Sequence, residues 1–126
     1  MSMTGSRRST PKYRAKKTTI DGLTFDSQLE GRRYLQLKAR EKSGEIEGLQ
    51  LQVEFQVSRG MKNRMTGQKV RSSMYIADFV YWDRAQQRYI AEDTKGMETP
   101  EFRLKWKLCQ SLYPQYEWRK VKKEDM

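Results

Sequence analysis

The stretch SMYIADFVYWDRAQQRYIAEDTKG, residues 73–96, predicts two antiparallel strands joined by a tight turn. The first strand is apolar on both faces, which is typical of a strand in the middle of a sheet. If residues 84–87 form the turn, partners across the two strands have numbers that sum to 171. Asp78 then lies directly opposite Asp93.

Two opposed aspartates require an explanation, because like charges directly across a strand pair are destabilising. Lys95 lies two residues beyond Asp93 and shares its face, whereas Glu92 and Thr94 point to the other face. Lys95 or a divalent metal ion between the aspartates would remove the repulsion. Two alternatives stay open: Asp93-x-Lys95 as an ordinary surface ion pair, and a turn one residue longer, which would separate the aspartates.

Local signals predict the elements around this hairpin. They are a hairpin at Asp21-Gly22, a helix over 27–42, a strand over 49–57, a helix from 99 to about 113 and a strand over 116–121. The strict apolar–polar alternation of 49–57 indicates one half-buried strand. A crossover helix makes the last strand parallel to the third. The expected fold class is α/β: a helix, a three-stranded antiparallel meander, a crossover helix and a parallel fourth strand. Residues 18–126 are expected to form one domain after a basic tail, 1–17, without regular structure.

The basic residues point to a polyanionic partner. The chain has 26 Lys and Arg against 16 Asp and Glu, a formal charge of +10, and nucleic acid is the usual partner of such a chain. The basic residues form two groups that contain no acidic residue. One lies in the tail, and the other lies over 58–71, in a loop or long hairpin tip. Both are expected to bind the DNA backbone without reading its sequence. The alternative is a tail that only keeps the protein soluble. The residues are Arg7, Arg8, Lys12, Arg14, Lys16, Lys17, Arg59, Lys62, Arg64, Lys69 and Arg71.

Missing residue types narrow the chemistry. The chain has no histidine, which excludes a Ser-His-Asp triad and a histidine-metal centre. A single cysteine, Cys109, makes neither a zinc cluster nor an internal disulfide. No apolar run approaches the ~20 residues of a membrane span, so an intracellular protein without a membrane partner is expected. Hydrolytic chemistry would then depend on carboxylates, lysine and a metal that prefers oxygen ligands.

Glu30 has two interpretations. With Ser27 it matches a capping box at the start of the first helix. It also shares one stripe of that helix with Tyr34 and Leu37, at i, i+4 and i+7, although Leu35 interrupts the pattern. A stripe that faces the sheet would make Glu30 a third carboxylate of the site. We favour this role over the cap.

The helix glutamate in FDSQLEGRRY, the aspartate in YIADFVY and the following EDTKG together resemble the PD-(D/E)XK nuclease superfamily over about 19–121. The sequence as a whole is similar to a small, largely phage-encoded family of predicted endonucleases. Its local motifs are similar to those of phage endonucleases that resolve Holliday junctions. The resemblance implies a restriction-endonuclease-like core with Asp78, Asp93 and Lys95 as the core motif and Glu30 as the helix acid. Ala77 replaces the motif's proline, and Asp93 replaces the commoner glutamate.

The resemblance implies a Mg²⁺-dependent DNA endonuclease in which Mn²⁺ can substitute. Asp78, Asp93 and the Thr94 carbonyl would hold the metal ion. Glu30 would bind a second metal ion or orient its water. Lys95 would activate the attacking water or stabilise the charge that develops on the phosphate. A preference for branched DNA would require paired sites and hence a homodimer, in the cytoplasm of a bacterial host. The alternatives are a non-catalytic nucleic-acid-binding protein with the nuclease fold and a phage assembly or replication accessory that binds a protein.

Overall fold

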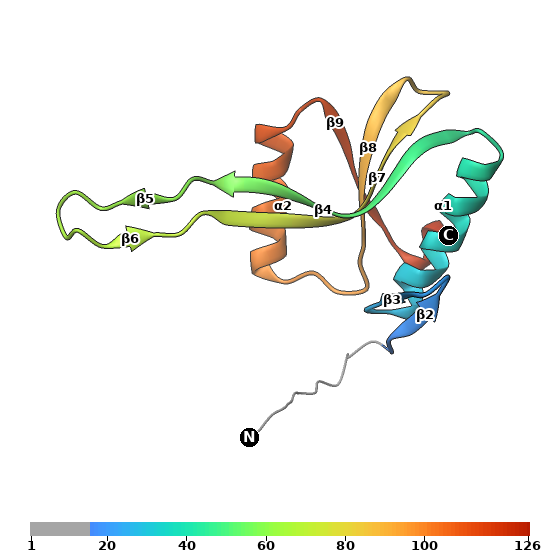
Figure 1. Ribbon diagram of the computed structural model, residues 1–126, viewed down its shortest axis with the longest axis horizontal. Helices are drawn as coiled ribbons and strands as arrows, with labels where there is room; N and C mark the ends of the chain where they lie inside the picture. Colours follow the sequence, from blue (N-terminus) through green and yellow to red (C-terminus); the bar gives the residue numbers. More distant parts are fainter. Residues whose placement is uncertain (1–15) are drawn as a thin grey trace.

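The computed structural model describes residues 16–126 and has a mixed α/β architecture (Figure 1). Its central sheet has four strands in the order β4-β7-β8-β9. Their bounds are β4 (Ile46–Ser58), β7 (Ser73–Asp83), β8 (Arg88–Thr94) and β9 (Tyr116–Val121). The first three strands form an antiparallel meander, and β9 is parallel to β8. The expected order of elements and strand directions is confirmed.

The hairpin of β7 and β8 has the predicted register. The paired residues run from Asp83↔Arg88 to Phe79↔Glu92, and the numbers of each pair sum to 171. The ladder ends at Phe79↔Glu92, so Asp78 and Asp93 lie one position beyond the last pair. The regular pairing of the two strands therefore ends just before the predicted pair of aspartates, and the Asp78 side chain bonds to Thr94 of β8 instead.

Two helices cover opposite faces of the sheet. α1 (Gln28–Lys42) and α2 (Pro100–Leu112) begin at the predicted N-caps, where the hydroxyls of Ser27 and Thr99 accept from backbone N–H groups. Neighbouring residues of β8 point to opposite faces, and Ile90 packs in the α1 cluster while Ala91 packs in the α2 cluster. Buried apolar residues that the helices contribute are Tyr34, Leu37, Phe102, Trp106 and Cys109.

The strand β4 does not keep one face toward one core, contrary to the simple alternation. Leu49 and Leu51 pack in the α1 cluster, whereas Phe55 and Val57 pack in the α2 cluster, although all four have the same parity. Gln52 lies at the change: its φ is +54°, and it is skipped between the pairs Leu51↔Phe79 and Val53↔Ala77. A left-handed residue reverses the facing of the residues after it. The irregularity lies opposite Asp78.

A short hairpin packs on the start of α1. β2 (Thr18–Ile20) and β3 (Leu23–Phe25) are joined by Asp21 and Gly22, both with positive φ, as the Asp-Gly signal predicted. The hairpin comes so close to the helix that a Cβ at Gly31 would lie 2.6 Å from the side chain of Thr18. Glycine at this position therefore lets the hairpin cover the first turns of α1, next to Glu30.

The remaining elements are short. β5 (Met61–Lys62) and β6 (Lys69–Val70) continue the hairpin of β4 and β7 beyond the sheet, and a 3-10 turn, η1 (Lys123–Asp125), ends the chain. Figure 1 shows β5 and β6 on an arm that projects from the body. Most of the predicted tail, residues 1–15, lies outside the described residues.

Candidate active site

Five predicted residues line one pocket, at the end of the sheet where β7 and β8 separate. The pocket has a volume of about 530 Å³. Its lining includes Glu30, Asp78, Asp93, Thr94 and Lys95. These residues come from α1, β7 and the end of β8, elements up to 65 positions apart in the sequence. The structure thus brings together all the residues predicted for catalysis or metal binding.

Asp78 is fixed by the end of the neighbouring strand. Its Oδ2 atom accepts a hydrogen bond from the Thr94 backbone N–H at 2.9 Å and another from the Thr94 hydroxyl at 2.9 Å. The backbone N–H of Lys95 bonds instead to β9, at the Val121 carbonyl. Because successive residues of a strand direct their backbone groups to opposite sides, the Thr94 carbonyl points toward β7, the strand that carries Asp78.

Asp93 is the most strongly perturbed acid of the pocket. It is only 3% exposed, and its carboxylate accepts from the Tyr75 hydroxyl and lies 3.4 Å from the Lys95 amine. Burial and the neighbouring Asp78 carboxylate raise the pKa of Asp93 to about 8, against the opposing effects of Tyr75 and Lys95. The Lys95 amine also lies 4.4 Å from the centre of the Phe102 ring. Lys95 alone therefore does not neutralise the site.

Glu30 points into the pocket and is 6% exposed. Its backbone N–H donates to the Ser27 hydroxyl at 3.0 Å, while its carboxylate accepts from the side-chain amide of Gln52 at 3.0 Å. Burial, followed by Asp78 and Asp26, raises the pKa of Glu30 to about 7. The Ser27 cap is thus present, and the Glu30 carboxylate belongs to the pocket as well.

The donor chemistry of this pocket fits a hard divalent cation. Glu30, Asp78 and Asp93 supply carboxylate oxygens, which Mg²⁺ prefers, and the described residues that line the pocket include no cysteine or histidine. Burial, and after it the neighbouring Asp78 carboxylate, raises the pKa values of Glu30 and Asp93, and a bound cation would favour the ionised form of both. Within residues 16–126, however, no three acidic side chains already converge as a ligand set. Asp78 is held by Thr94 and Asp93 by Tyr75, so binding would require these carboxylates to turn.

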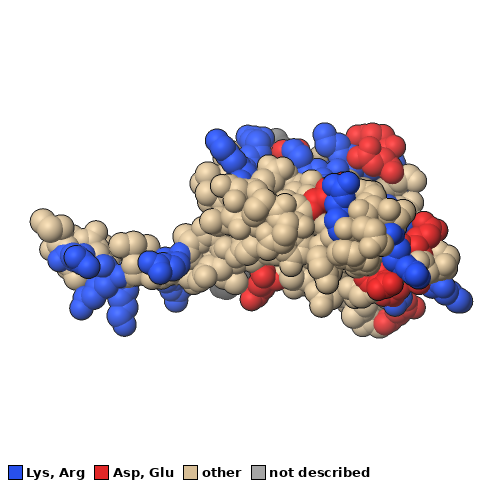
Figure 2. All heavy atoms as spheres, turned by 90° about the horizontal axis from the view of Figure 1, so that it is seen from above, with Lys and Arg blue, Asp and Glu red and all other residues tan. Residues whose placement is uncertain are grey.

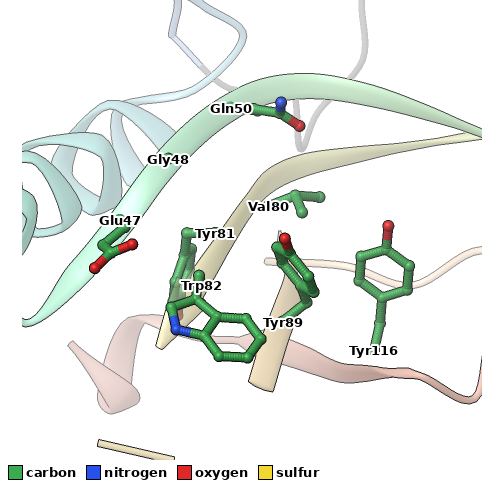
Figure 3. A pocket seen from close by; sticks show the side chains of 8 residues that line it. All are labelled: Glu47, Gly48, Gln50, Val80, Tyr81, Trp82, Tyr89 and Tyr116. Carbon is green, nitrogen blue, oxygen red and sulfur yellow. The ribbon is translucent and has the colours of Figure 1, made fainter. Parts of the chain in front are cut away.

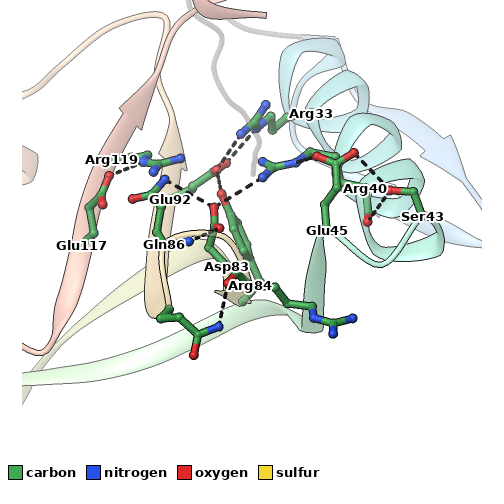
Figure 4. Close-up of polar contacts among 12 residues, drawn as sticks. Arg33, Arg40, Ser43, Glu45, Asp83, Arg84, Gln86, Glu92, Glu117 and Arg119 are labelled. Atoms are coloured by element: carbon green, nitrogen blue, oxygen red, sulfur yellow. Dashed lines mark hydrogen bonds and ion pairs between the residues drawn. The ribbon is translucent and has the colours of Figure 1, made fainter.

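Glu92 lies on the other face, as strand parity predicted, but it is completely buried. Its carboxylate accepts from Arg33 at 2.8 and 2.6 Å and from the Tyr81 hydroxyl (Figure 4). This arrangement compensates the charge within the protein. Glu92 therefore serves to hold α1 on the sheet through Arg33, whereas its neighbour Asp93 lines the pocket.

The predicted nucleic-acid-binding residues fall into two groups. Figure 2 shows blue side chains along the projecting arm, at a distance from the red acidic side chains of the body. All five predicted arm residues are exposed: Arg59, Lys62, Arg64, Lys69 and Arg71. Lys16 and Lys17 are exposed too, while four predicted tail residues lie outside the described part of the chain: Arg7, Arg8, Lys12 and Arg14.

A second pocket, of about 580 Å³, lies elsewhere on the sheet (Figure 3). Trp82, Tyr89 and Tyr116 contribute aromatic rings to it, and the Trp82 and Tyr89 rings pack edge to face with centroids 4.8 Å apart. Glu47 is its only charged side chain. None of the predicted site residues lines it. Its aromatic lining and single acid suit neither a metal nor a phosphate.

Three pocket contacts were missed by sequence reasoning. Gln52 donates to Glu30, Tyr75 donates to Asp93, and Asp26 raises the pKa of Glu30. Tyr75 and Asp26 are close in sequence to predicted residues, and such proximity is the only signal for them. Gln52 carries no signal of its own, because a left-handed glutamine within an alternating strand is not predictable from residue type.

The comparisons with known proteins identify a family. A family model described as "Protein of unknown function (DUF1064)" matches residues 10–124. The chain therefore belongs to the DUF1064 family. Neither the curated proteins nor the solved structures include a match. No helix within residues 16–126 is long and apolar enough to cross a membrane.

Proposed function

We propose that this DUF1064 protein is a metal-dependent DNA endonuclease with a restriction-endonuclease-like core of the PD-(D/E)XK type. One observation carries the proposal: Glu30, Asp78, Asp93 and Lys95, which the sequence singles out, line the same pocket. An aspartate within a central strand, an Asp-x-Lys at the end of the next strand and a helix glutamate form the expected arrangement of that site. The exposed basic residues of the arm supply the charge that a DNA substrate requires.

Asp78, Asp93 and the Thr94 carbonyl would hold one Mg²⁺ ion, or Mn²⁺ in its place, with Glu30 positioned for a second ion or its water. Such an ion polarises a phosphoryl oxygen and makes water a better nucleophile at neutral pH. Glu30 and Asp93 need a cation to remain ionised near neutrality, since their pKa values are raised. Binding of the metal would therefore release protons from these two groups.

Lys95 would stabilise the negative charge that develops on the phosphate during attack. Its amine lies 3.4 Å from Asp93, and its side chain is 27% exposed, so it is close to the carboxylates and still reachable from the pocket opening. The same amine lies 4.4 Å from the centre of the Phe102 ring, a cation–π contact that helps to hold it in the pocket. Lysine is suited to this role because its ammonium group is a compact charge with three donors.

The proposal is tested by cleavage assays on a panel of junction, flap, linear duplex and single-stranded DNAs with Mg²⁺, Mn²⁺ or Ca²⁺. Cleavage is expected with Mg²⁺ and Mn²⁺ and not with Ca²⁺ or chelator. Asp78→Ala should abolish cleavage and preserve DNA binding, because it removes a ligand and a negative charge. Glu54→Ala is the matched control, since Glu54 is an exposed acid on β4.

Two results would reject the proposal in different ways. Salt-sensitive DNA binding without cleavage under any condition would favour a non-catalytic nucleic-acid-binding protein. Absence of salt-sensitive binding would favour an accessory that binds another protein. Cleavage by Asp78→Ala at the wild-type rate in single turnover would disprove the assignment of the metal site.

A further inference from the structure

The arm, defined as residues 59–71, is a two-stranded ribbon that extends beyond the core. It continues the hairpin of β4 and β7, and every residue from 58 to 72 is exposed. In Figure 1 it projects from the body on the side away from α1. Because the arm buries no apolar side chain, packing against the core does not explain it.

The ribbon has one basic and one apolar face. Lys62 pairs directly with Lys69 across the two strands, and Met61 pairs with Val70. Opposed like charges are destabilising in a strand pair. The sequence offers no compensation, since it has no acidic residue between Glu54 and Asp78. A pair of lysines in this arrangement suits an anion that binds between them.

The tip of the ribbon is a closed turn. The Asn63 side chain accepts hydrogen bonds from the backbone N–H groups of Met65 and Thr66 at 2.9 and 3.1 Å. The Asn63 backbone bonds to Gly67 and Gln68, and Gly67 has a φ of +74°. These bonds hold the two strands together, so the lysine pair is presented by a preformed ribbon.

We propose that the arm lies along duplex DNA and contacts its phosphates, through Lys62 and Lys69, roughly one helical turn from the cleaved bond. This inference rests on the proposed function and adds the part of the substrate that the arm binds. Duplex DNA carries one negative charge per about 1.7 Å of its axis, which suits a straight basic ribbon. Residues 58–73 contain no aromatic residue, whereas proteins that bind single strands stack bases on aromatic rings.

The length of the hairpin gives the distance from the active site. Lys69 lies nine positions before Asp78 in the sequence. At a rise of about 3.3 Å per residue, these positions span roughly 30 Å. That length corresponds to about nine base pairs of B-DNA, with a turn of ~34 Å per 10 base pairs. Only a duplex that extends this far from the cut can reach the lysine pair.

The experiment compares duplexes with flanks of about 5 and about 15 base pairs beside the cleavage site. Affinity is measured in Ca²⁺ by fluorescence anisotropy over a range of salt concentrations. The test protein is the double variant Lys62→Gln, Lys69→Gln. The control is Arg103→Gln, Lys107→Gln, which removes two exposed charges from α2. Circular dichroism verifies the fold of both variants.

Wild type and control are expected to bind the long duplex about tenfold more tightly than the short one. The arm variant should lose this advantage, and its log–log salt slope on the long duplex should fall by about 2, one unit per lost phosphate contact. On the short duplex, which does not reach the lysine pair, the arm variant and the control variant should bind with the same affinity.

The inference is overturned if the arm variant weakens binding to both lengths equally, if its salt slope stays the same, or if a single strand of the same length gives the same gain. A wild type that cleaves but binds both lengths equally would disprove the arm inference alone. A wild type that neither binds nor cleaves any of these DNAs would disprove the proposed function itself.

Discussion

Arg33 and Glu92 form a buried, two-pronged ion pair that joins α1 to β8, with N–O distances of 2.8 and 2.6 Å. Arg33 lies one helical turn after Glu30, and Glu92 immediately precedes Asp93. The pair therefore connects the elements that carry two of the pocket carboxylates (Figure 4). Since Glu92 is fully buried, it has no solvent to stabilise its charge if Arg33 is lost.

Glu92→Gln is expected to destabilise the protein by up to about 3 kcal/mol, because it leaves the Arg33 charge, whose side chain is only 11% exposed, without its carboxylate partner. Urea unfolding at neutral pH measures the loss. The control is the double variant Arg33→Met, Glu92→Leu, which removes both charges and should be much closer to wild type in stability. A single variant as stable as wild type would show that the pair contributes little to holding α1 on the sheet.

The stability of the metal-free protein should fall as the pH rises from 5 to 8. The pKa of Asp93 is raised from its ordinary value of 3.8 to about 8. Within this window the folded protein therefore holds a proton that the unfolded chain has released, and the free energy of unfolding decreases with pH. Each pKa unit corresponds to ~1.4 kcal/mol.

Asp93→Asn cannot titrate and isolates this effect. In chelator, wild type should lose at least about 2 kcal/mol more stability than Asp93→Asn between pH 5 and 8. Mg²⁺ should restore wild type at pH 8 and leave the variant unchanged, because metal binding requires the ionised carboxylates. Urea unfolding at both pH values gives the comparison. Identical pH dependence of the two proteins would contradict the raised pKa of Asp93.

The strand order and the pairing of β7 with β8 were predictable, because their signals are local. Asp21-Gly22 forms its hairpin, Ser27 and Thr99 begin the helices, and the four-residue turn fixes the register. The register in turn predicts that Asp78 and Asp93 come together. The separation of the strands at that point was not predictable, since it depends on how the twisted sheet meets both helices.

Other features of the site depend on tertiary contacts and left no clear pattern. The change of face at Gln52 is invisible in a strand whose apolar residues alternate throughout. The burial of Glu92 was also missed, because strand parity separates it from Asp93 without indicating what packs against it. Arg33, its partner, is 59 positions away and looks like any basic residue on a helix.

Deletion of residues 1–16 is expected to weaken DNA binding and to flatten its salt dependence. The deletion removes five of the first six basic residues and leaves Lys17. If the tail contacts phosphates, the log–log salt slope should decrease by about 2–4. Titrations of the same duplex at several salt concentrations provide the measurement. An unchanged slope would show that the tail only contributes to solubility.

Selectivity for branched DNA requires two active sites and hence a homodimer. The basic residues of the arm could then contact more than one duplex of a junction. Analytical ultracentrifugation of the protein, free and bound to a four-way junction, is expected to reveal a dimer in at least the bound state. A monomer under both conditions would argue strongly against junction resolution and leave linear or flap DNA as the substrate.

Asp93 and Glu92 allow the sharpest test of the active site, because both are buried acids one position apart. Asp93 opens into the pocket beside Lys95, whereas Glu92 faces Arg33 and Tyr81. Asn and Gln preserve shape and remove charge, so the two substitutions differ mainly in the face they affect. Only Asp93 is placed to bind a hard cation.

Asp93→Asn should lower the single-turnover cleavage rate by orders of magnitude, at any Mg²⁺ concentration, because an amide is a poor ligand for Mg²⁺. Glu92→Gln should retain most of the rate at temperatures where circular dichroism shows it folded, with its cost confined to stability. Matched Mg²⁺ titrations of both variants decide the question. The opposite ranking would mean that β8 slips by one residue and that Glu92 is the ligand. Equal and mild effects would reduce Asp93 and Lys95 to an ordinary ion pair.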